Sequence, residues 1–60
     1  MDKEEISFML KDIAKRLQRL NEWEIGFIVN VEDRFLKGQS LSKKQLDTLD
    51  KIYEKATENG

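Results

Sequence analysis

The chain has sixty residues, enough for one domain but too few for a large core. Hydrophobic and charged residues each make up 38% of it, and it has no histidine, cysteine or proline. This composition excludes a disulfide-stabilised fold, a structural zinc site, and catalysis by cysteine or histidine. So short a chain can hardly enclose a substrate pocket, so we expect a binding or regulatory module without cofactor or metal, not an enzyme.

The charges fall in blocks although the net charge is only −1. Residues 11–19 carry four cations, residues 20–33 carry four acids, and residues 34–44 carry four more cations. This pattern predicts surfaces of opposite sign. The acidic start of the chain and the lack of a long apolar run predict no signal peptide, no membrane contact and a cytoplasmic location.

The first predicted helix spans residues 3–20, with Asp2 as its N-cap. It contains no glycine or proline that would interrupt it. Its apolar side chains recur every three or four positions and predict one buried stripe, made of Ile6, Met9, Leu10, Ile13, Ala14, Leu17 and Leu20.

Two further helices are predicted over residues 22–37 and 43–57. Asn21 with Glu24, and Ser42 with Gln45, have the spacing of capping boxes. Gly38 predicts a left-handed residue after the second helix. Residues 1–60 are therefore expected to form one all-α domain, a small three-helix assembly whose second and third helices make a helix–loop–helix unit.

The second helix is expected to be the centre of the core, because apolar residues occupy most of its circumference and require cover from two directions. One broad side carries Ile25, Ile28, Val29, Val31, Phe35 and Leu36, and Trp23 and Phe27 lie toward the opposite side. On this interpretation Trp23 is a core or corner residue.

The first candidate site is the outer face of the first helix, where Phe8, Lys11, Lys15 and Arg19 are expected to align. An aromatic residue beside three cations is typical of a surface that stacks bases and binds phosphates of single-stranded nucleic acid. The alternative is a solvated basic face whose one Phe lies against lysine stems or in a dimer contact.

The second candidate site is the corner between the second and third helices, residues 34–45. Its cations Arg34, Lys37, Lys43 and Lys44 are expected to contact phosphates, beside the amides of a helix N-terminus and donors from Gln39 and Ser40. The alternative is a surface turn with solubilising lysines. Glu22 and Glu24 are interpreted as acids of a helix start and Glu32 as a partner of Arg16 or Lys51, rather than as a metal or acid–base site together with Asp33.

The segments Leu20-Asn21-Glu22-Trp23-Glu24, Leu41-Ser42-x-Lys44-Gln45 and Leu49-x-x-Ile52-Tyr53 resemble a short helical module of phage replication and repair proteins. In particular, they resemble the small accessory proteins encoded beside the UvsW recombination helicase of T4-type phages. The resemblance implies a helix–loop–helix fold, a role in DNA recombination, repair or replication in the host cytoplasm, and partnership with a helicase or with single-stranded DNA.

Two functions follow from these observations. The first is a non-enzymatic accessory protein that binds single-stranded nucleic acid at the corner, with the first helix as a secondary strip. The second is an adaptor or inhibitor that docks to a helicase or another protein through Phe8 and Trp23 without touching nucleic acid. A homodimer is compatible with both.

Overall fold

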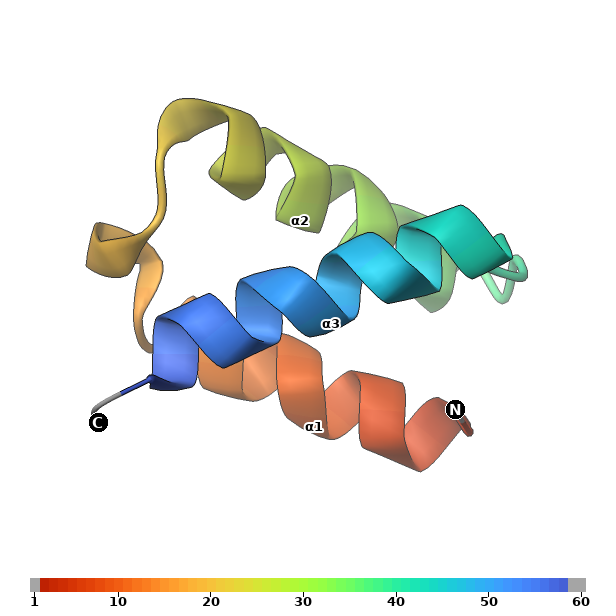
Figure 1. Ribbon diagram of the computed structural model, residues 1–60. Coiled ribbons are helices and arrows are strands. Elements are labelled where there is room, and N and C mark those ends of the chain that lie inside the picture. The colour runs from red at the N-terminus through yellow and green to blue at the C-terminus, as the bar shows by residue number, and fades with distance from the viewer. Residues whose placement is uncertain (1, 59–60) are drawn as a thin grey trace.

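The computed structural model describes residues 2–58 and confirms the all-α fold. Its elements are α1 (Lys3–Ala14), the short 3₁₀ helix η1 (Leu17–Arg19), α2 (Glu22–Leu36) and α3 (Lys43–Thr57), with no strand in the described range. Consecutive α-helices run in opposite directions, so α1 and α3 run the same way and α3 contacts both other helices (Figure 1). None of the described helices combines the length and apolar content needed to cross a bilayer.

All three predicted N-caps are confirmed. The Asp2 carboxylate accepts a hydrogen bond from the Glu5 amide at 2.8 Å. Asn21 with Glu24, and Ser42 with Gln45, form complete capping boxes in which each side chain accepts from the other residue's backbone N–H. These bonds satisfy amide donors of the first turns that would otherwise lack partners.

The predicted extent of the first helix, residues 3–20, is wrong. α1 ends at Ala14, Arg16 leaves the helical region with φ −129°, and η1 follows. A helix as long as the prediction would leave no residues to reverse the chain before the Asn21 cap, and helix–helix connections need several residues. Ala14 is consequently exposed and Leu17 is 37% exposed, whereas Leu20 still reaches the core.

The prediction that the second helix centres the core is also wrong. α2 buries only Ile28 and Val31 completely, whereas Val29, Leu36 and Trp23 are 58%, 75% and 66% exposed. The core is built mainly between α1 and α3, whose buried side chains are Ile6, Met9, Leu10, Ile13, Leu49, Ile52 and Ala56. α2 therefore packs on α1 and α3 through one face only. The helix surfaces on either side of this face remain exposed.

The turn between α2 and α3 begins with the predicted glycine. Gly38 has φ +77°, in the left-handed region. The Gln39 amide donates to the Arg34 carbonyl at 3.0 Å and the Gly38 amide donates to the Phe35 carbonyl at 3.1 Å. This pair of bonds is a Schellman motif, which ends α2 and sets the direction in which the chain leaves it.

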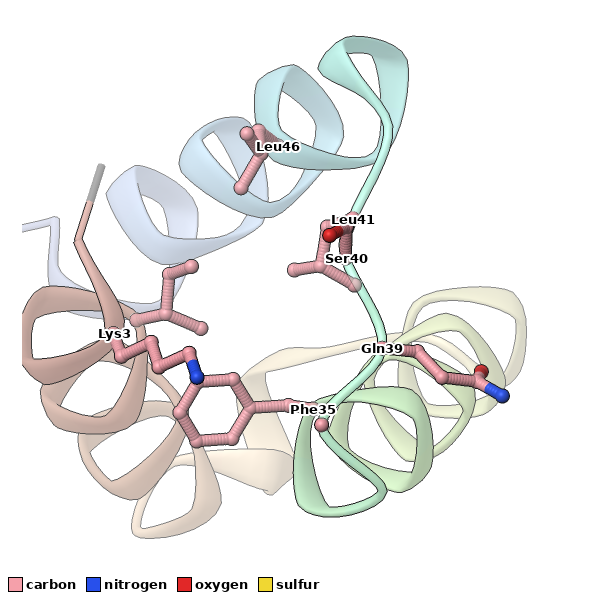
Figure 2. Close-up of a pocket in the computed structure, with 8 residues that line it drawn as sticks. Lys3, Phe35, Gln39, Ser40, Leu41 and Leu46 are labelled. Carbon is pink, nitrogen blue, oxygen red and sulfur yellow. The ribbon is translucent and has the colours of Figure 1, made fainter.

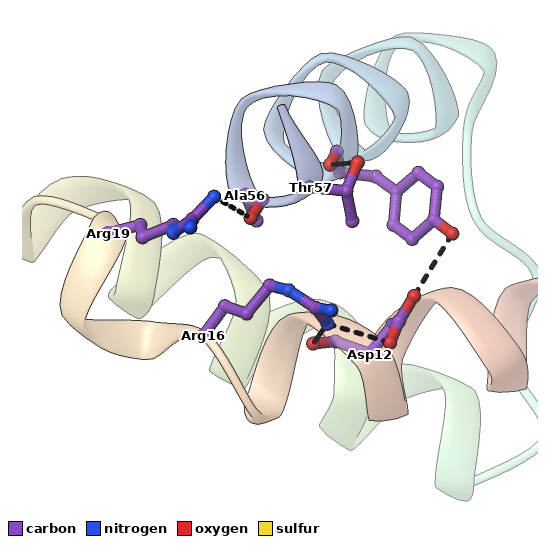
Figure 3. Close-up of polar contacts among 6 residues, drawn as sticks. Asp12, Arg16, Arg19, Ala56 and Thr57 are labelled. Carbon is purple, nitrogen blue, oxygen red and sulfur yellow. Dashed lines mark hydrogen bonds and ion pairs between the residues drawn. The ribbon is translucent and has the colours of Figure 1, made fainter. Parts of the chain in front are cut away.

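Polar contacts tie α1 and η1 to α3 (Figure 3). The Asp12 carboxylate accepts from Arg16 at 2.8 Å and from the Tyr53 hydroxyl at 3.1 Å. The hydrogen bond from Arg16 lowers the pKa of Asp12 below its ordinary value of 3.8, and the bond from Tyr53 adds to this effect. The Arg19 guanidinium donates to the Ala56 carbonyl at 3.1 Å, at the carboxyl end of α3, where a cation is favourable.

The two described glycines predict opposite effects of the same substitution. A Cβ added to either meets no atom within 4 Å, so only the backbone conformation distinguishes them. Gly38→Ala is expected to lower the free energy of unfolding by about 1–2 kcal/mol, because alanine is strained at positive φ. Gly26→Ala, inside α2, is expected to raise it by about 0.5–1 kcal/mol. Urea denaturation of both variants checks the pair, and equal effects would contradict the assigned turn.

The Asp12 contacts predict a loss of stability in acid. Because the folded-state pKa is lowered, the contribution of Asp12 is present above pH 3.8 and disappears as the pH falls through the folded-state value. The difference in unfolding free energy between the native chain and Asp12→Asn is therefore expected to shrink as the pH falls from 3.8 toward the folded-state value. Urea titrations at neutral and acidic pH measure it, and a difference that does not change with pH would contradict this account.

Candidate nucleic-acid interface

An open groove lies between α2 and the first turns of α3. Its volume is about 430 Å³, and it is lined from α2 by Trp23, Phe27 and Arg34 and from the α3 side by Ser42, Lys44, Gln45 and Thr48. The direction of α3 is antiparallel to that of α2, so Arg34 lies toward the same end of the groove as Lys44 (Figure 1). We call this site the groove.

The groove carries positive charge. Within residues 2–58, neither Arg34 nor Lys44 makes an ion pair, and both line the groove. None of the described residues that line it is acidic, although the whole chain has twelve Asp and Glu residues. Two unpaired cations that line one hollow, with no acidic residue in its lining, attract an anionic ligand.

The other two predicted phosphate-binding cations lie outside the groove. The Lys37 ammonium is 3.0 Å from the Asp33 carboxylate one turn earlier on the same helix end. Lys43 is exposed at the start of α3 but does not line the groove. The corner therefore brings Arg34 and Lys44 together and places Lys37 and Lys43 at its periphery.

The Glu24 carboxylate, next to Trp23 in the sequence, is paired with a cation. Its Oε1 atom accepts from the Asn21 amide at 2.9 Å and from the Lys55 ammonium at 2.8 Å. The hydrogen bond from Lys55, and after it the bond from Asn21, lowers the pKa of Glu24 below its ordinary value of 4.5. The Glu24 carboxylate, which directly follows Trp23 in the sequence, thus ties the N-terminus of α2 to α3. Its charge is already balanced by the Lys55 ammonium.

The aromatic side chains of the groove were not expected there. Trp23 stacks on Phe27 with ring centroids 5.7 Å apart and an interplanar angle of 14°. Trp23 is exposed, so its predicted core role is wrong, and Phe27 is half-buried against the core. The groove residues of α2 are four and seven positions apart, so they lie on one flank of the helix: Trp23, Phe27 and Arg34. This spacing is the feature of the sequence from which their common position could have been predicted.

The expected polar donors of the corner are not in the groove. Gln39 and Ser40 border a separate cavity of about 290 Å³ between α1 and the turn, with the apolar residues Ile6, Phe35, Leu41 and Leu46 (Figure 2). In Figure 2 the Gln39 amide points away from this cavity. The backbone N–H of Gln45, in the first turn of α3, already donates to the Ser42 hydroxyl at 3.1 Å, so the capping box uses this donor.

The secondary strip on α1 is only partly assembled. Phe8 is 63% exposed, and Lys11 and Lys15 are exposed on the same face. Arg19 does not join them, because α1 ends before it and its guanidinium donates to the carbonyls of Ala56 and Glu58. The prediction of a four-residue strip that includes Arg19 is therefore wrong.

Two of the four acidic residues in residues 20–33 have cationic partners. Glu24 and Asp33 each pair with a lysine, whereas Glu22 and Glu32 are exposed. Among residues 2–58, no three Asp, Glu, His or Cys side chains come together in a way that would hold a metal ion. The chemistry that the groove itself supports is non-covalent binding of an anion with an apolar or aromatic part.

Comparison of the chain with protein-family models, with curated proteins and with solved structures finds no match. The resemblance to the accessory proteins encoded beside a phage recombination helicase therefore stays a prediction.

The cap beside the groove predicts a stability effect. Ser42→Ala removes the acceptor for the Gln45 amide and is expected to lower the free energy of unfolding by about 0.5–2 kcal/mol. Ser40→Ala, two residues earlier and exposed, is the matched control and is expected to change it by less than about 0.5 kcal/mol. Thermal or urea unfolding measures both, and equal effects would mean that the capping box does not stabilise α3.

Proposed function

We propose that the chain is a non-enzymatic accessory protein that binds single-stranded nucleic acid in the groove between α2 and α3. The observation that carries this proposal is the placement of Arg34 and Lys44, from two different helices, around one hollow without an acidic lining residue. Phosphate is the anion that nucleic acids present along their whole length, and arginine and lysine are its usual partners.

A single strand fits the groove better than a duplex. Duplex readout needs a helix that enters the major groove with base-reading side chains such as Asn or Arg on its face. The first turns of α3 instead present Lys43, Lys44 and the capping residues. Binding through so few cations is expected to be weak and strongly dependent on salt.

The wider role rests on the resemblance in sequence. It supports a place in phage DNA recombination, repair or replication, in the host cytoplasm and beside a helicase. In this proposal the chain contributes strand binding, and any hydrolysis of nucleotide belongs to its partner.

Charge reversal of two neighbouring lysines tests the proposal. Lys44→Glu is expected to weaken binding of a labelled single-stranded oligonucleotide at low salt much more than Lys43→Glu does, because only Lys44 lines the groove. Both substitutions place an acid in the first turn of α3, where it is favourable, so neither is expected to unfold the chain. Fluorescence anisotropy measures the two affinities.

The same titration gives the salt dependence. Neutralising two phosphates of a single strand predicts an affinity loss of roughly sevenfold between about 50 mM and 200 mM salt, and four phosphates roughly fiftyfold. If no binding is detected at low salt, or if Lys43→Glu and Lys44→Glu weaken it equally, the groove is not the phosphate-binding site.

The second candidate function is docking to another protein, and the exposed flank of α2 favours it. Val29 and Leu36 are seven residues apart, two helical turns, and both are exposed apolar residues on the same flank. A surface of this kind is typical of an interaction site with a helicase, another protein or a second copy of the chain, and the exposed Phe8 on α1 is a further apolar contact point. Absence of oligonucleotide binding at low salt would favour this function.

A further inference from the structure

The groove contains a flat aromatic surface as well as cations. Trp23 and Phe27 stack nearly parallel, at an interplanar angle of 14°, and Phe27 is held by its contact with the core. Trp23 is 66% exposed, so a large part of the indole is open to solvent. The Phe27 ring therefore supports the Trp23 indole on one side, and the exposed part of the indole is available to a ligand.

The aromatic pair and the cations belong to one site. All four side chains, Trp23, Phe27, Arg34 and Lys44, line the same groove. Trp23 and Arg34 are eleven residues apart on α2, a rise of about 16 Å along the helix axis. This separation allows a strand to place a base at one end of the groove and the phosphates of neighbouring nucleotides near the other.

Two of the hydrogen-bonding groups between the two ends already have partners within the protein. The Thr48 hydroxyl donates to the Lys44 carbonyl at 2.9 Å, and the Gln45 side chain accepts from the Ser42 amide at 2.8 Å. With these two groups used internally, the groove offers mainly a π-face and charge to a ligand. This arrangement suits stacking that tolerates any base.

From these observations we propose that an unpaired base of a single strand stacks on Trp23 in the groove while Arg34 and Lys44 bind phosphates further along the same strand. This inference rests on the proposed function and adds to it the recognition of the base. Each stacked base in such sites contributes an affinity of about 5- to 150-fold. Recognition is expected to be indifferent to sequence and selective for unpaired bases.

An abasic strand separates stacking from phosphate binding. Two labelled oligonucleotides of equal length are titrated with the protein at low salt, one of deoxyadenosine and one of abasic sites with the same phosphates. The native chain is expected to bind the base-containing strand about 5- to 150-fold more tightly. Trp23→Ala is expected to bind both strands equally, with the affinity that the native chain has for the abasic strand.

Phe8→Ala is the matched control, because Phe8 is exposed to the same degree as Trp23 but lies on α1, away from the groove. It is expected to keep the full difference between the two strands. The emission of Trp23, the only tryptophan, is a second readout, and stacking is expected to quench it with the base-containing strand but not with the abasic one.

The possible results distinguish this inference from the function on which it rests. If the native chain binds both strands equally and with salt dependence, phosphate binding stands and base stacking is wrong. If Trp23→Ala and Phe8→Ala reduce the difference equally, the aromatic site is not in the groove. If neither strand binds at low salt, both the proposed function and the stacking are wrong.

Discussion

The turn between α2 and α3 is the constraint on which the groove depends. Its start is fixed by the Schellman bonds around Gly38, and its end by the capping box of Ser42 and Gln45. Only residues 37–42 separate the two helices, so these two sets of backbone bonds leave the connection little freedom. They place Arg34, in the last turn of α2, near Lys44, in the first turn of α3. A cationic hollow thus results from local hydrogen bonds in a chain whose net charge is −1.

The core explains why α2 is available for binding. α1 and α3 bury most of the apolar residues between them. The contact of Asp12 with Tyr53 joins this pair, and the contact of Arg19 with Ala56 joins η1 to α3. α2 uses only one face to cover the pair. Its flank with Trp23 and Arg34 borders the groove, whereas its flank with Val29 and Leu36 is aliphatic and exposed. Two chemically different surfaces therefore lie on one helix.

The sequence predicted what short-range bonds decide. The three caps and the left-handed glycine depend on residues within a few positions of one another, and all were predicted correctly. The end of α1 at Ala14 was not predicted, because no glycine or proline marks it. The need to reverse the chain there is a property of the whole fold. The buried face of α2 was also not predicted, since apolar residues surround the helix and only its neighbours decide which are covered. The sequence pattern consequently predicts a core or corner position for Trp23, which is exposed. It predicts a binding strip that includes Arg19, which instead donates to a carbonyl at the end of α3.

The central claim is that Trp23, Arg34 and Lys44 form one binding surface for a single strand. The most direct measurement is an NMR titration of the isotopically labelled chain with a short single-stranded oligonucleotide at low salt. The account predicts that the largest shift changes occur at the Trp23 indole N–H and at the amides of Lys44, Gln45 and Thr48, with little change at Phe8 and Lys11. Changes centred on Phe8, Lys11 and Lys15, or no changes at all, would contradict it.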